Sequence, residues 1–116
     1  MLEQYGNQSK SYLSSLVRQS LNSFKAFSYQ AITVDGTVNN LTVPVGAKYA
    51  FLVFESSATG IAARYLETSQ STVSTTLGLA LSNLDRFDIT DAQNLVSFQI
   101  TQAQAGTHTL HVQYGK

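Results

Sequence analysis

The chain lacks cysteine and tryptophan, has a single proline, and only 12% of its 116 residues are charged. Without cysteine it can form neither a disulfide framework nor a thiolate metal site. The seven basic and seven acidic residues balance to zero net charge, and the basic ones are scattered along the chain. Nucleic acid and anionic membrane surfaces both require clustered Lys and Arg. We therefore expect neither a nucleic acid nor a membrane as partner.

Long apolar runs are also absent, because no stretch approaches the roughly 20 residues of a membrane span. The first residues have no basic region followed by an apolar run, so we expect no signal peptide and synthesis in a cytoplasm. Neutral polar residues are abundant instead: 42 of the 116 residues are Ser, Thr, Asn or Gln. The 43% hydrophobic share is sufficient for the core of one domain. With so few charges, we expect neighbouring subunits to cover much of the surface.

Residues 1–27 have a helical pattern, and we treat them as an N-terminal helix or arm before a β domain of residues 28–116. Six apolar residues recur at steps of three and four, which places them on one stripe of an α-helix that Ser9 would cap. An isolated helix of this length is marginal in water. It therefore either covers the sheet of its own domain or forms an arm or bundle between copies. The stripe consists of Tyr12, Leu13, Leu16, Val17, Leu21 and Phe24.

From residue 28 onward, short β-type runs are separated by turn signals. This spacing predicts a mainly β fold, an antiparallel β-sandwich or jelly roll of about eight short strands. Asp35-Gly36 predicts a two-residue hairpin, with a wider turn at Asn39-Asn40 as the alternative. The expected strands are 28–34, 41–43, 48–55, 61–67, 77–81, 87–89, 95–101 and 107–114.

Two signals overlap near residue 95. Thr90 and Gln93 fit a capping box, which predicts a helical turn. The following run, 95–101, alternates as a strand does, and we expect Val96, Phe98 and Ile100 to face inward there.

The run 48–55 is apolar on both faces. Tyr49, Phe51 and Val53 alternate with Ala50, Leu52 and Phe54. The outer face of a sandwich sheet normally meets water, so aromatic residues on it predict a cover, either the N-terminal helix or a second subunit. Phe51 and Val53 are therefore interface candidates.

Arg64 lies in the middle of an apolar run. It would pair across the strands with Glu55 or Glu67, or reach across a subunit interface. Arg64 is the third interface candidate in the β domain.

Residues suited to chemistry are few. His108 and His111 are three apart, which on a strand places them on opposite faces and prevents them from sharing one metal. No serine lies in a nucleophile motif such as G-x-S-x-G. The sequence therefore predicts no catalytic residues, no cofactor and no metal, and a protein that is not an enzyme.

Two further groups have structural explanations. Asp85, Asp88 and Asp91 recur at steps of three, whereas calcium loops alternate their ligands at steps of two. Capping and turn roles explain these carboxylates better. The strand tyrosines (49, 65 and 114) could stack on sugars, but core or interface packing is the favoured interpretation.

A set of residues spread over 31–114 has a distinctive order: Leu41-Thr-Val-Pro44, Gly46-Ala47, Ala50, Glu55, Arg64-Tyr65, Gly78, Phe87, Ile89, Leu95, Phe98, Ile100 and Thr109-Leu110-His-Val112-Gln-Tyr114. This order resembles a group of small virion proteins of tailed bacteriophages, β-sandwich domains found among head, decoration and tail genes. In that group an Asp-Gly turn and a Pro-Thr pair usually follow Arg-Tyr, whereas residues 67–75 have neither.

The resemblance implies a structural role in the virion without a cofactor. The first hypothesis is a capsid cement or decoration protein that binds the major capsid protein, with the residue 1–27 arm as the fastening element. A homo-oligomer is expected, with a trimer favoured and a dimer as the alternative. A head–tail connector or tail component is the alternative within this class. A carbohydrate-binding sandwich that contacts the host surface is the alternative from another class.

Overall fold

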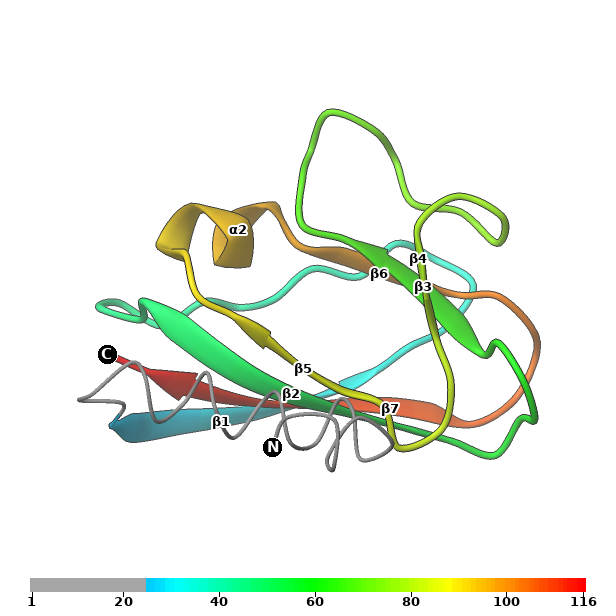
Figure 1. Cartoon of the computed structure of the whole chain (residues 1–116), viewed down its shortest axis with the longest axis horizontal. Helices are drawn as coiled ribbons and strands as arrows, with labels where there is room; N and C mark the ends of the chain where they lie inside the picture. Colours follow the sequence, from blue (N-terminus) through cyan, green and yellow to red (C-terminus); the bar gives the residue numbers. More distant parts are fainter. Residues whose placement is uncertain (1–24) are drawn as a thin grey trace, which may run out of the picture.

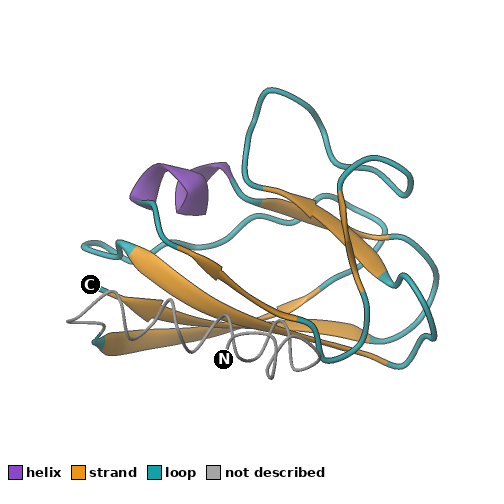
Figure 2. Ribbon diagram, viewed as in Figure 1, coloured by secondary structure: helices purple, strands orange, loops and turns teal. Residues whose placement is uncertain are grey.

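The computed structural model describes residues 25–116. The helix expected before residue 25, with its stripe from Tyr12 to Phe24, lies outside the described residues. The described part is mainly β, with seven strands in two antiparallel sheets and one short helix (Figures 1 and 2). In chain order the elements are β1 (Ala26–Thr33), β2 (Tyr49–Ser56), β3 (Ala63–Leu66), β4 (Leu79–Leu81), β5 (Arg86–Ile89), α2 (Ala92–Ser97), β6 (Gln99–Gln102) and β7 (His108–Gly115).

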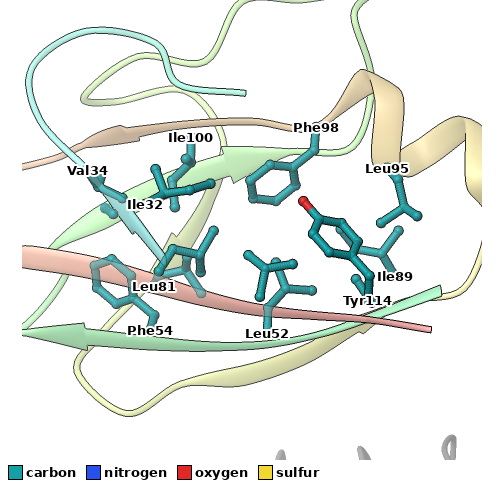
Figure 3. Close-up of a cluster of buried hydrophobic side chains, with 14 of the residues drawn as sticks. Ile32, Val34, Leu52, Phe54, Leu81, Ile89, Leu95, Phe98, Ile100 and Tyr114 are labelled. Atoms are coloured by element: carbon teal, nitrogen blue, oxygen red, sulfur yellow. The ribbon is translucent and has the colours of Figure 1, made fainter. Parts of the chain in front are cut away.

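The larger sheet has four strands in the order β1-β7-β2-β5, and the smaller has three in the order β4-β3-β6. The alternation of β2 and β7 sends every second side chain toward the smaller sheet. Leu52 lies opposite Val112, and Phe54 lies opposite Leu110, and all four are fully buried. These residues meet Phe98 and Ile100, which face them from the other layer (Figure 3).

A three-ring aromatic cluster joins the two sheets. Tyr65 of β3 stacks on Phe87 of β5 with ring centroids 4.5 Å apart. Phe98, between α2 and β6, lies 5.7 Å from Tyr65 and 6.2 Å from Phe87. Each such pair adds about 0.5–1.5 kcal/mol beyond the area it buries. The cluster therefore contributes to holding the layers together at the α2 end.

The hairpin predicted at Asp35-Gly36 is wrong, although the turn itself is present. The Asp35 carboxylate accepts hydrogen bonds from the backbone N–H of Thr37, at 2.9 Å, and from its hydroxyl, at 2.6 Å. β1 pairs with β7, however, and the chain after the turn bridges from Asn39 to Ile100 of the smaller sheet. The local Asp-Gly signal makes a turn, but long-range pairing decides which strand lies beside β1. Residues 41–43 form no strand.

The strand predicted at 95–101 is wrong over its first half. Asp91 has extended backbone and accepts the N–H of Gln93 at 2.7 Å, which starts helix α2 and confirms the helical turn with Asp91 rather than Thr90 as its cap. Helical spacing then buries Leu95 and leaves Val96 64% exposed. The prediction that Phe98 and Ile100 face inward is confirmed.

This correction can be tested with two neighbouring substitutions. We expect Leu95→Ala to lower the free energy of unfolding by about 2–5 kcal/mol, because it empties a buried site. Val96→Ala should change it by less than about 0.5 kcal/mol. Denaturant unfolding of the two variants measures both values, and the reverse order would contradict the helix.

Candidate interaction surface

The side chains of β1, β7 and β2 that point away from the smaller sheet form what we call the outer face. Cross-strand register sets its three rows. The first two rows carry large apolar or aromatic groups and continue into β5 with Asp88 and Arg86, and Glu55 lies in the third row. The outer face is therefore apolar at one end and polar at the other. The rows are Tyr29–Gln113–Phe51, Ala31–His111–Val53 and Thr33–Thr109–Glu55.

A shallow depression of about 220 Å³ lies in the first two rows. Tyr29, 61% exposed, forms one wall, and the half-buried Phe51 and Val53 form another. A second depression of about 360 Å³ adjoins it along the start of β1, where Phe27 and Tyr29 project. Together they make a continuous apolar surface beside the β1 edge of the sheet.

A hydrogen-bonded chain crosses the outer face. The Tyr29 hydroxyl lies 2.6 Å from Nδ1 of His111, and Nε2 of His111 lies 2.6 Å from Oε1 of Glu55. A carboxylate only accepts hydrogen bonds, so in the neutral imidazole Nε2 donates to Glu55 and Nδ1 accepts from Tyr29. The chain fixes the Tyr29 ring, which stacks on His111 at 6.0 Å. It presents an oriented phenol on an open sheet surface.

The opposite sheet has its own cover. The connection between β3 and β4 loops out above the smaller sheet (Figure 1). Gln99 of β6 donates from its side chain to the carbonyls of Thr68 and Ser71, each at 2.6 Å, and accepts the N–H of Val73 at 3.1 Å. Val73 is buried as a result. Residues 67–78 therefore cover the outward side of this sheet.

Arg64 also belongs to this cover. Its Nε donates to the Thr75 carbonyl at 3.0 Å, and its Nη1 donates to the Gly78 carbonyl at 2.9 Å. Gly78 has φ +132°, and a Cβ there would lie 2.9 Å from Val73 and 3.1 Å from the Arg64 Cβ. The guanidinium is therefore occupied by loop carbonyls, in place of the predicted pair with Glu55 or Glu67.

His108 and Asp85, two further candidates from the sequence, have structural partners. His108 is buried and stacked on Phe54, with Nδ1 2.8 Å from the Ser56 hydroxyl and Nε2 2.8 Å from the Gln104 carbonyl. His111 lies on the outer face, so the two histidines occupy opposite faces as their spacing predicts. Asp85 accepts the N–H of Ser82. In residues 25–116 no group of three or more His, Cys, Asp or Glu is placed to hold a metal ion.

The structure brings together only part of the predicted interface. Phe51 and Val53 lie side by side on the outer face, whereas Arg64 lies on the other sheet. Tyr29 and His111 were not predicted as members of a site. Their signal is the alternation of β1 and β7, but it identifies the site only once the pairing of these two strands is known.

Comparison with known proteins identifies no relative: no family model, curated protein or solved structure matches the chain. No helix in the described part of the chain is long and apolar enough to span a membrane.

The two hydrogen bonds from Arg64 to the carbonyls of Thr75 and Gly78, which we call the clamp on residues 67–78, can be tested by substitution. We expect Arg64→Ala to lower the free energy of unfolding by about 1–2 kcal/mol, because two charge-assisted hydrogen bonds are lost. Amide exchange in residues 68–78 should accelerate, while exchange in β7 changes only with global stability. Lys48→Ala, an exposed site, is the control. Unchanged exchange in the loop would contradict the clamp.

Glu67 generates a pH prediction. Burial raises the pKa of its carboxyl, and the hydrogen bond from Asn94 at 3.2 Å offsets part of that effect. The folded state therefore holds this proton more tightly than the unfolded state, and stability falls as pH rises above the ordinary value of 4.5. We expect Glu67→Gln to make the decline of unfolding free energy between pH 4.5 and 7 shallower. An unchanged slope would contradict this assignment.

Proposed function

We propose that this chain is a non-enzymatic structural protein of a tailed-bacteriophage virion, and first of all a capsid cement or decoration protein. It would bind the major capsid protein and stabilise the head. The supporting observation is the outer face, where Tyr29, Phe51 and Val53 form an apolar surface that Asp88 and Arg86 of β5 border on one side. The resemblance of residues 31–114 to phage virion proteins supports the same role. A head–tail connector or tail component would use this surface in the same way.

The finer description of the fold is part of this proposal. We describe the two sheets as a β-sandwich of the jelly-roll kind, with the N-terminal helix or arm of residues 1–27 attached to it. The buried layer between the sheets and the crossing of the chain from β1 to the smaller sheet support this description.

Burial of the outer face would drive attachment. Fully burying an exposed Val or Phe side chain is worth about 1.5–3 kcal/mol, and the half-buried Val53 and Phe51 would each contribute part of that. The sandwich would be the body and the N-terminal arm the fastening element. A homo-oligomer is part of the proposal, with a trimer as the favoured form because local three-fold positions of a capsid suit it. The protein would be made in the host cytoplasm and reside in the virion.

A second candidate function rests on Tyr29 and the polar side chains next to it on the outer face. Sugars are bound by an exposed aromatic ring beside planar amide and carboxylate groups, since these match the apolar and hydroxyl faces of a pyranose. Tyr29, held by His111, lies opposite Gln113 in this arrangement. A carbohydrate-binding module that contacts the host surface is therefore the alternative from another class.

Virion content tests the first candidate. In the phage whose genome encodes this chain, we expect mass spectrometry of purified virions to find it at a fixed copy number, in the head fraction after heads and tails are separated. Val53→Asp should reduce that copy number about tenfold, which corresponds to 1.4 kcal/mol of binding. Ala80→Asp, on exposed β4 of the other sheet, is the matched control. Circular dichroism would show that both variants fold.

The outcomes separate the alternatives. Presence in the tail fraction would favour a connector or tail component. Absence from virions would overturn the structural role. Saturable glycan binding that Tyr29→Ala removes would then support the carbohydrate-binding module.

A further inference from the structure

We propose that, in the free protein, the outer face is covered by residues 12–24 of the same chain, with the stripe from Tyr12 to Phe24 packed against the depression at Tyr29 and Val53. The occupant is this chain's own segment, and a second copy is the competing outcome. The inference concerns the purified chain and does not rest on the virion role.

The two sheets differ in how their outward sides are covered. Residues 67–78 cover the smaller sheet and are held there by Gln99 and Arg64. Within residues 25–116, no segment crosses the outer face of the larger sheet (Figure 1). That face nevertheless carries the larger apolar groups, including Tyr29 and Val53. An exposed apolar surface of this kind marks a site where another segment or chain packs.

The position where the described chain begins makes residues 12–24 the natural cover. The Lys25 carbonyl accepts the backbone N–H of Lys116 at 3.3 Å, and Ala26 pairs with Gly115. Lys25, the first described residue, therefore lies at the β1 edge of the outer face, next to the depression lined by Phe27 and Tyr29. The segment needs no linker to reach it.

The length of residues 12–24 as a helix also agrees with the size of the outer face. Thirteen residues in a helix span about 20 Å, at 1.5 Å per residue. An eight-residue strand spans about 26 Å, and the three strands of the outer face lie across about 10 Å, close to the diameter of one helix. One helix of this length therefore fits on the outer face without overhanging it.

The charges of the two parts are complementary. Residues 12–24 contain a single charged residue, Arg18, which gives the segment a net charge of +1. Residues 26–116 have four basic and six acidic residues, a net charge of −2. Glu55 lies on the outer face itself, in the third row. The attraction would orient the segment, while the apolar stripe supplies most of the contact.

A segment of the same chain has an advantage over a second copy. A short tether gives an effective concentration in the millimolar range. A second copy at micromolar concentration would need about a thousandfold higher affinity for the outer face to compete with the tethered segment. The stripe should therefore occupy its own sheet unless the tether prevents it, and here the tether starts at the face.

The absence of cysteine provides a clean test in the full-length chain. We would introduce Val53→Cys together with Leu13→Cys, Leu16→Cys or Val17→Cys, one pair at a time, because a disulfide forms only when the two Cα atoms come within about 7 Å. We expect at least one pair to oxidise to a disulfide-linked monomer, seen as faster migration on a non-reducing gel. In the matched control, Ala80→Cys on the other sheet replaces Val53→Cys, and the cysteine in residues 12–24 is kept. No efficient linkage should form in this control.

Each result has a defined meaning. A disulfide-linked dimer would replace the same-chain cover with a second copy and overturn the proposal. Equal linkage to positions 53 and 80, or none to 53, would overturn it as well. As a second measurement, the losses in denaturant midpoint from Leu16→Ala and Val53→Ala should be non-additive, whereas Leu16→Ala and Ala80→Ser should add. Neither readout involves a virion, so failure here leaves the virion result unaffected.

Discussion

The pairing of β7 between β1 and β2 is the constraint on which the rest of the structure depends. β7 aligns both neighbours, so its inward residues, Leu110 and Val112, form the centre of the core. The same alignment brings Tyr29 beside His111 and places Val53 on the other side of it. A shift of one residue would exchange the two faces of a strand and remove both the core and the outer face. The pairing of β7 with β1 and β2 therefore determines both the core and the candidate site.

The two outward surfaces use different physical solutions. The smaller sheet is covered by a segment almost free of charge, which is held through its backbone by the side chains of Gln99 and Arg64. The larger sheet presents side chains with a large apolar surface and needs a cover that is itself apolar. Hydrogen bonds are directional, so the first cover is tied to one geometry. Apolar contact is not directional, so a cover of the second surface is less restricted to one geometry.

Periodicity in the sequence was sufficient for the two-sided strand at 48–55, whose alternation between two faces is confirmed. It failed where a local cap competed with alternation, since Asp91 turned residues 92–97 into a helix. It also failed wherever the answer depended on distant pairing. The role of Arg64 followed from a loop whose path no local pattern encodes, and Tyr29 meets His111 only because strands 82 residues apart lie together. Mainly β architecture was thus predictable from the sequence, whereas the composition of the surface was not.

The same pairing has a consequence for how the chain folds. β1 is the first described strand and β7 the last, so the edge and the centre of the larger sheet are separated by most of the domain. During synthesis, β1 and β2 leave the ribosome without the strand that lies between them. Their apolar faces stay exposed until residues 108–115 emerge. The high sequence separation of these contacts implies slow folding, in milliseconds to seconds, and a period in which association between nascent chains competes with it.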